Sequence, residues 1–297
     1  MTADAGPLPP RSALVVPAAP GSRLDRAPLR GADQVVIDLE DAVAEQDKAA
    51  AREALVRTLA APVWDGVDLA VRVNGWESAH TWADVVALFQ QAPGRFGTIV
   101  LPKTESAAQV QALDLLVGQL ERWSGQPAGG VRLCALVESA AGLLAAEPVA
   151  AAAPRLSALV LGPLDLAGDL DVPGDDDTDE PLPGPWREDA LRRLVLAGRA
   201  HGLTVLDGPS FALDDADLVR RVAVRARRAG CDGSWVVHPG QVAPVHEAFA
   251  PSDTEVEQAR AVLDLVTDDA AVVRLGGRML DTASLRRARS VVARAGR

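Results

Sequence analysis

The sequence is poor in aromatic residues and in cysteine. Its 297 residues include no Tyr, 4 Phe and 6 Trp, and only two cysteines, Cys134 and Cys231. So few aromatic side chains argue against a surface that stacks nucleic-acid bases, and the net charge of −11 repels phosphate backbones and anionic membranes. Two distant thiols form neither a disulfide framework nor a zinc cluster. We therefore expect no nucleic-acid partner and no membrane partner.

The chain also lacks long apolar segments. Its first residues, MTADAGPLPPRS, do not contain the apolar stretch of a secretory signal peptide. No uncharged apolar run reaches about 18 residues, the length that a membrane-spanning helix needs. The overall apolar fraction of 48% nevertheless suffices for a full core, which excludes wholesale disorder. These features predict a cytoplasmic globular protein.

Short, β-branched apolar runs alternate with segments of helical periodicity. Several runs, such as GTIVLP and LSALVLG, are apolar almost throughout, which is typical of strands buried on both faces of a parallel sheet. The alternation predicts a (β/α)8 TIM barrel; an open doubly wound sheet is the alternative, although no G-x-G-x-x-G follows the first strand. The predicted strands are Ala13–Pro17, Gln34–Glu40, Asp68–Asn74, Gly97–Lys103, Arg132–Glu138, Leu156–Gly162, Thr204–Asp207 and Ser234–His238.

Two segments do not follow this alternation. Asp171–Pro185 is charged, rich in proline and poor in apolar residues, which predicts either a solvated linker or a lid over an active site. Beyond the barrel, assigned to residues 1–251, the segment 252–297 contains two predicted helices, Thr254–Leu265 and Thr282–Ala295. We expect this helical extension to form an arm that packs on a neighbouring subunit.

Polar residues collect at the carboxyl ends of the predicted strands. In a TIM barrel these ends meet at one rim, where catalytic groups lie. This clustering, with apolar strand interiors below it, is the main sequence argument for an enzyme. The residues are Asp38, Glu40, Asp41, Arg72, Asn74, Lys103, Glu138, Asp165, Asp207 and His238.

Glu138 and Asp165 follow consecutive strands, so their carboxylates can approach the same ion. Two carboxylates together with waters and substrate oxygens are the usual ligand set of Mg²⁺, which keeps several of its waters. The alternative is that each side chain caps the helix that follows it. We favour a Mg²⁺ site at this pair.

Arg72 ends an apolar strand and should face the mouth of the barrel. A guanidinium there needs an anionic partner, which is either a substrate oxygen or an ion-pair partner such as Glu40 or Asp41. The two roles are compatible. We therefore take Arg72 as a catalytic and substrate-binding candidate, and Glu40, Asp41 and Glu138 as further substrate-binding candidates.

Two other residues at the rim are less specific. Lys103 could form a Schiff base only if its pKa were depressed, and the neighbouring carboxylates oppose that. His238 could be a general base, but because Pro239 follows it we favour a structural, hydrogen-bonded role.

Several stretches match a known family pattern from about Arg11 to Ala295. The chain resembles the citrate lyase beta subunit-like group of the HpcH/HpaI aldolase superfamily, which includes malyl-CoA and citramalyl-CoA lyases. The matching stretches are RSALVVPAAPGSRLDRA, GADQVVIDLEDAVAEQDKAAAR, VRVN, VLPKTES, LVESAAG, LGPLDLAGDL and GCDGSWVVHPGQVAPVHEAFAPS.

This resemblance implies a (β/α)8 barrel that binds Mg²⁺ and acts on a carbon–carbon bond next to a thioester. The family's metal ligands fall on Glu138 and Asp165, and its substrate-binding arginine falls on Arg72. Its acid/base aspartate, donated across a subunit boundary, falls on Asp281 in RMLDTASLRRAR. The family usually has proline two positions later, where this chain has Ala283.

The resemblance also implies partners. Arg23 and Arg26 match the part of the family that meets the phosphates of CoA, and relatives of this kind assemble as homotrimers or hexamers. We expect a Mg²⁺-dependent lyase that cleaves or forms a 3-hydroxyacyl-CoA thioester through a thioester enolate, with a 2-oxo acid as the other reactant. The alternatives are a citrate lyase beta subunit acting on a carrier-bound citryl thioester, a CoA-independent pyruvate aldolase and a non-catalytic binding module.

Overall fold

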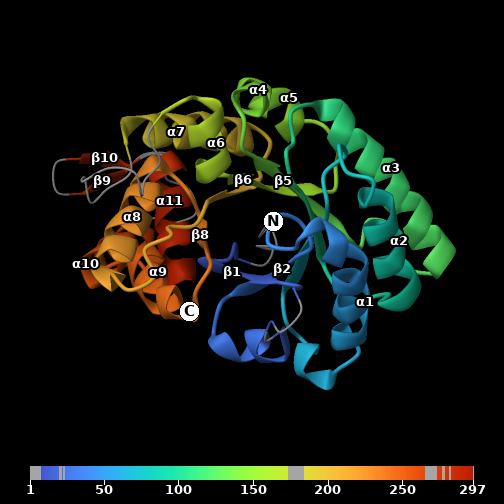
Figure 1. The fold of residues 1–297 in the computed structure, drawn as a ribbon. Helices are drawn as coiled ribbons and strands as arrows, with labels where there is room; N and C mark the ends of the chain where they lie inside the picture. The colour runs from blue at the N-terminus through green and yellow to red at the C-terminus, as the bar shows by residue number, and fades with distance from the viewer. Residues whose placement is uncertain are drawn as a thin grey trace. The chain divides into compact units, whose positions relative to one another are not determined.

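Eight parallel strands close into a barrel in chain order, so that β1 pairs with both β2 and β8 (Figure 1). The computed structural model describes residues 8–19, 22, 24–172, 184–264, 273–275, 278–280 and 282–296. The TIM barrel predicted from the sequence is confirmed. The strands are β1 (Ser12–Pro17), β2 (Gln34–Asp38), β3 (Leu69–Arg72), β4 (Thr98–Leu101), β5 (Arg132–Val137), β6 (Leu156–Leu161), β7 (Thr204–Asp207) and β8 (Gly233–Val236).

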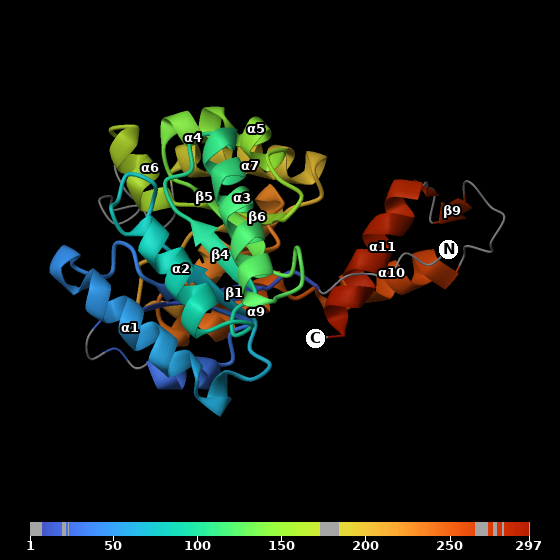
Figure 2. The ribbon, with the colours of Figure 1, turned by 90° about the vertical axis from the view of Figure 1, so that its right-hand side faces the viewer.

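Helices lie between the strands and cover the outside of the barrel; in Figure 2, α1, α2 and α3 lie side by side. The α-helices are α1 (Lys48–Leu59), α2 (Thr81–Gln91), α3 (Ala107–Ser124), α4 (Ala140–Leu144), α5 (Ala146–Ala150), α6 (Pro163–Asp169), α7 (Pro185–Ala200), α8 (Ala216–Ala229) and α9 (Val242–Phe249). Short 3-10 helices are η1 (Leu24–Arg30), η2 (Glu45–Asp47), η3 (Pro62–Trp64) and η4 (Pro239–Gln241).

Apolar side chains of the strands form the buried core of the barrel. Burying such side chains stabilises the fold by about 25 cal/mol for each Å² of apolar surface removed from water. The outward-facing side chains pack against the helices, which is why the strands read as continuous apolar runs. The core cluster contains Ala13, Val36, Ala70, Val100, Cys134, Leu136, Val160, Leu206 and Trp235.

Local sequence signals set the ends of two long helices. Asp215 caps α8 by accepting a hydrogen bond from the backbone N–H of Leu218 at 2.8 Å. Gly125 and Gly230 follow α3 and α8 with φ values of 72° and 107°, in the left-handed region that glycine occupies without a steric penalty. The chain therefore turns out of each of these helices at a glycine.

The chain divides into two compact units, Pro10–Ala248 and Met1–Pro9 with Phe249–Arg297. The second unit contains α10 (Asp253–Asp264), β9 (Val273–Leu275), β10 (Arg278–Leu280) and α11 (Thr282–Ala295); α10 packs against α11, and β9 pairs antiparallel with β10. The sequence analysis placed both helices within one residue of these bounds and missed the two short strands. Within the described part of the chain, no helix is both long and apolar enough to span a membrane.

Candidate active site

A cavity of about 370 Å³ opens at the carboxyl ends of the strands. Polar side chains line one part of its wall, and they come from β2, β3 and the segments after β2, β5 and β6: Asp38, Asp41, Arg72, Glu138 and Asp165. The rest of the wall is mostly apolar and includes Val15, Pro17, Leu136, Leu161, Phe211 and Trp235. The sequence prediction that polar strand ends converge on one rim therefore holds for these five residues.

Arg72 is held by carboxylates of the β2 end. Its Nε and Nη2 donate to the two oxygens of Asp38, each at 2.7 Å, and its Nη1 lies 2.9 Å from Oε2 of Glu40. Burial alone would lower the pKa of Arg72, but the hydrogen bond and charge of Asp38 outweigh it and raise that pKa. Arg72 is therefore a fixed cation that faces the cavity. The ion pair with Glu40 expected as one of its two roles is present.

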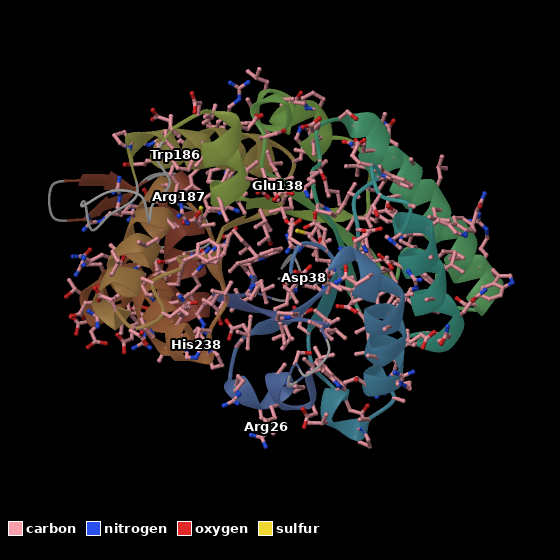
Figure 3. The ribbon with its side chains drawn as sticks, in the orientation of Figure 1. Arg26, Asp38, Glu138, Trp186, Arg187 and His238 are labelled. Carbon is pink, nitrogen blue, oxygen red and sulfur yellow. The ribbon has the colours of Figure 1, made fainter. Side chains whose placement is uncertain are left out.

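Asp38 fixes this arrangement, although the sequence analysis gave it no role beyond its position at a strand end. Its side chain is fully buried and also accepts hydrogen bonds from the backbone N–H groups of Glu40, at 2.9 Å, and Ala42, at 3.3 Å. Figure 3 shows Asp38 and Glu138 near the centre of the barrel. Because four donors surround one carboxylate, the guanidinium of Arg72 has a single well-defined orientation.

Glu138 and Asp165 come together at the ends of β5 and β6. Glu138 is 4% exposed, and its Oε1 accepts the backbone N–H of Lys103 at 2.7 Å. Burial, together with the charge and hydrogen bond of Asp165, raises the pKa of Glu138 to about 8, although the N–H of Lys103 and the charge of Arg72 lower it. Asp165 lies exposed in the first turn of α6. The predicted carboxylate pair is therefore formed.

Gly162, at the end of β6, makes room for this pair. A Cβ atom at Gly162 would lie 2.5 Å from Cβ and 2.6 Å from Oε2 of Glu138, which is closer than side-chain atoms can approach. The absence of a side chain at this position therefore allows Glu138 to lie over the end of β6.

The donor set at this pair fits a divalent cation. The charge of Asp165 opposes ionisation of the neighbouring Glu138, and a cation bound between them would relieve this repulsion, whereas Arg72 is engaged by Asp38 and Glu40. Among the described residues, no three His, Cys, Asp or Glu side chains gather as a cation site. Two carboxylates on a cavity that admits water and a substrate match Mg²⁺, which does not need a cage made entirely of protein ligands.

Lys103, which follows β4, contacts the carboxylates that follow β2. Its Nζ is 2.7 Å from Oε1 of Glu40 and 3.3 Å from Oδ1 of Asp41. Desolvation, which lowers the pKa of Lys103, is outweighed by the Glu40 hydrogen bond and the two carboxylate charges, so that pKa is raised. A lysine that stays protonated is not a Schiff-base nucleophile.

Other predicted residues lie outside the cavity wall or outside the described residues. Arg26 is exposed on η1 and lies at the edge of the barrel in Figure 3. His238 caps η4 by accepting the backbone N–H of Gly240 at 3.2 Å, in agreement with the structural role favoured for it. Arg23 and Asp281, and most of Asp171–Pro185, lie outside the described residues.

Two of the polar strand ends serve the packing of the barrel instead. Asn74 is buried and donates to Oδ2 of Asp84 at 2.6 Å. Asp207 pairs with the buried Arg187 of α7 at 3.0 Å. A strand-end position alone therefore did not separate site residues from structural ones, because the direction of each side chain depends on its partners.

Comparison with known proteins places this geometry in a family. The model of the HpcH/HpaI aldolase/citrate lyase family matches residues 11–239. The chain belongs to this family. It is 36% identical to the L-malyl-CoA/beta-methylmalyl-CoA lyase of Cereibacter sphaeroides, over 93% of this chain and 92% of that protein. The family and the class of carbon–carbon lyases predicted from the sequence are confirmed.

Two further relatives bear on the chemistry of the family. The (3S)-malyl-CoA thioesterase of Cereibacter sphaeroides is 35% identical over 84% of this chain and 81% of its own. The crystal structure of CitE from Mycobacterium tuberculosis in complex with magnesium, acetoacetate and coenzyme A is 30% identical, with a TM-score of 0.73 over 97% of this chain and 98% of that one.

Proposed function

We propose that this protein is a Mg²⁺-dependent carbon–carbon lyase that cleaves or forms a 3-hydroxyacyl-CoA thioester of the malyl-CoA or citramalyl-CoA type. The observation that carries the proposal is the buried carboxylate of Glu138 beside Asp165, on the same cavity as the fixed cation Arg72. The names of the relatives support it, since they include a lyase of malyl-CoA and a family member that binds both magnesium and coenzyme A.

Cleavage of such a substrate generates a negative charge that the chain has to stabilise. The 3-hydroxyl group gives its proton to water, the bond between carbons 2 and 3 of the acyl chain breaks, and its electron pair moves into the thioester as an enolate. Protonation of the enolate carbon then yields a shorter acyl-CoA and a 2-oxo acid. Arg72 donates hydrogen bonds to the enolate oxygen, a contribution of about 3 kcal/mol for one well-placed donor.

Glu138 and Asp165 would hold the metal. When bound there, Mg²⁺ supplies Lewis acidity toward the carboxylate and carbonyl oxygens of the 2-oxo acid. Glu40 and Asp41, which follow β2, pair with Arg72, and Asp41 lines the cavity in which the substrate would lie.

We assign the proton transfer to Asp281 on the basis of the family resemblance. Its carboxylic acid form would protonate the enolate carbon in cleavage, and its carboxylate would remove that proton in condensation. Residues 252–297 would form an arm, after the catalytic barrel of residues 1–251, that carries this aspartate to a neighbouring subunit. This proposal includes a cytoplasmic homotrimer or hexamer, which size-exclusion chromatography with light scattering would test.

Arg23 and Arg26 are assigned to the phosphates of CoA on the same basis. The exposure of Arg26 on η1 supports this role, because a phosphate ligand has to reach the guanidinium from solvent. Replacing both arginines with alanine should raise KM for a CoA thioester and leave the unfolding free energy unchanged.

A substrate screen tests the proposed function. Purified protein is incubated with short 3-hydroxyacyl-CoA esters, with Mg²⁺ or with EDTA, and the shorter acyl-CoA, the 2-oxo acid and free CoA thiol are each quantified. We expect a shorter acyl-CoA and a 2-oxo acid in equal amounts, only with Mg²⁺. Release of free thiol with an intact hydroxy acid identifies a thioesterase instead, and turnover of a carrier-bound citryl thioester alone identifies a citrate lyase subunit.

The two metal ligands have their own test. Glu138→Ala and Asp165→Ala should each abolish Mg²⁺-dependent activity while circular dichroism shows an intact fold, because each removes one of two anionic ligands. Full activity in either variant would remove the metal assignment. The non-catalytic alternative is disfavoured because both carboxylates are present and face each other, and a Schiff-base aldolase is disfavoured because Lys103 stays protonated.

A further inference from the structure

Lys103 connects two parts of the site that come from different strands. It follows β4 with a φ of 49°, and Lys103 and Asp171 are the non-glycine residues with positive φ in the described part of the chain. Residues other than glycine avoid this region because Cβ crowds the following carbonyl. A strained backbone next to a proposed metal ligand indicates that the surrounding structure imposes the conformation.

The backbone of Lys103 holds the metal side of the cavity. Its N–H donates to Oε1 of Glu138 at 2.7 Å. The next residue anchors the turn, since the N–H of Thr104 donates to the carbonyl of Leu136 at 3.0 Å and its hydroxyl donates to the carbonyl of Leu101 at 2.9 Å. The left-handed conformation therefore aims one peptide group at the buried carboxylate.

The side chain of Lys103 holds the arginine side of the cavity. Its ammonium donates to Oε1 of Glu40 at 2.7 Å, while Oε2 of the same carboxylate accepts from Nη1 of Arg72 at 2.9 Å. The Arg72–Glu40 contact is buried on both sides, whereas the Lys103 side chain reaches Glu40 from the solvent side and is 45% exposed. Lys103 and Arg72 therefore share the charge of one buried carboxylate.

The net charge of the groups around Arg72 depends on the ammonium of Lys103. Three carboxylates, Asp38, Glu40 and Asp41, face two cations, Arg72 and Lys103, which gives the cluster a net charge of −1. Without the ammonium the cluster would carry −2, and Arg72 alone would have to neutralise Glu40. The extra negative charge would then repel a substrate anion in the cavity, and Arg72 would be more strongly bound to Glu40 and less able to bind that anion.

We propose that Lys103 is a positioning residue with two separable parts: its peptide N–H fixes Glu138 for the metal, and its ammonium takes up the charge of Glu40 so that Arg72 binds an anion. The proposal rests on the proposed function for the metal at Glu138 and for the identity of the reacting anion. Comparisons between variants separate the two parts, because the first depends on the backbone conformation and the second on the charge of the side chain.

The comparison of Lys103→Gly with Lys103→Val tests the backbone part. Both variants lack the ammonium, but glycine adopts a positive φ freely and a β-branched residue does not. Titration calorimetry with Mg²⁺ alone should give a Kd about tenfold higher for Lys103→Val than for Lys103→Gly, which matches the usual strain of such a residue. Equal Kd values would overturn the backbone part.

The comparison of Lys103→Met with Lys103→Arg tests the ammonium part. Methionine keeps much of the length and removes the charge, whereas arginine keeps the charge. For Lys103→Met we expect KM for the thioester, and Kd for glyoxylate on the Mg²⁺-loaded protein, to rise about tenfold, as for the loss of one charge-assisted hydrogen bond. The Kd for Mg²⁺ should stay the same or fall, and Lys103→Arg should recover most of the anion binding.

Weaker anion binding without weaker Mg²⁺ binding separates positioning from a merely structural role, because a structural role would weaken the binding of both ions together. Parallel losses in Lys103→Met, or wild-type affinity for glyoxylate, would overturn the ammonium part. If the wild-type protein turned over no 3-hydroxyacyl-CoA ester, the proposed function would fail on its own. The Mg²⁺ and glyoxylate titrations would still decide the role of Lys103.

Discussion

Gly162→Ala tests how the fold positions Glu138 and Asp165, the two proposed metal ligands. The φ and ψ of Gly162 are −98° and 92°, which alanine adopts without strain, so the effect of the substitution is steric. The added Cβ would lie 2.5 Å from Cβ and 2.6 Å from Oε2 of Glu138. Because Cβ of Glu138 is tied to the backbone just after β5, rotation of its side chain cannot relieve the clash, and the two strand ends have to separate.

The magnitude follows from these contacts. Overpacking of this kind usually costs about 1–3 kcal/mol of unfolding free energy, which urea denaturation would measure. Displacement of a metal ligand through its surroundings commonly weakens metal binding about 10- to 100-fold, so we expect the Kd for Mg²⁺ to rise by that factor in titration calorimetry. The kcat/KM for the thioester should fall in parallel.

Gly168→Ala provides the matched control in the helix that follows. No atom lies within 4 Å of a Cβ built at Gly168, so alanine there should leave the Kd for Mg²⁺ unchanged. It should also stabilise α6 by up to about 1 kcal/mol, because alanine is the better helix former. A Gly162→Ala protein that binds Mg²⁺ with the wild-type Kd would refute the reasoning, whatever its stability.

Three further predictions concern the subunit boundary, the arginine clamp and acid stability. Mixing inactive Asp281→Ala and Arg72→Ala proteins under conditions of subunit exchange should restore part of the activity, because mixed oligomers contain some intact composite sites; no recovery despite proven exchange would place Asp281 in its own chain or outside the reaction. Asp38→Asn should lower the unfolding free energy by about 1–3 kcal/mol, measured with urea, since it turns an acceptor toward Arg72 into a donor. Burial, which raises the pKa of Asp33, is outweighed by its hydrogen bonds from Arg11, which lower that pKa to about 2. Its contribution, about 1–2 kcal/mol after solvent screening, should be full above about pH 4 and disappear as the pH falls toward about 2. Asp33→Asn should therefore be less stable than wild type at pH 7 and equally stable near pH 2; a constant difference across this range would contradict the assignment.

The sequence predicted the barrel because its physical cause is local. Strands buried on both faces need continuous apolar runs, and runs such as LSALVLG show this without any long-range information. The pairing of Glu138 with Asp165 was also predictable, since consecutive strands of a barrel are neighbours and their ends meet at one rim. The two short strands β9 and β10 were missed because three-residue strands leave almost no periodicity to detect.

The direction of each side chain at the rim was not predictable in the same way. Asn74, just after β3, and Asp207, at the end of β7, lie near the same rim as Arg72, yet they turn to Asp84 and Arg187 and serve packing. What separates them is the partner that each side chain meets, and those partners come from helices whose position depends on the whole barrel.

The sequence by itself thus determined the eight barrel strands, their ends to within about two residues, and which acidic pair shares a rim, because periodicity and strand order are properties of the chain. Only the tertiary structure decided that Asp38 accepts hydrogen bonds from Arg72 and that the backbone N–H of Lys103 donates to Glu138. It also decided that position 162 has no room for a side chain. These contacts join segments 34 and 35 residues apart or depend on a clearance between two strands. Such distances are set by the closure of the barrel, which no local pattern of residues encodes.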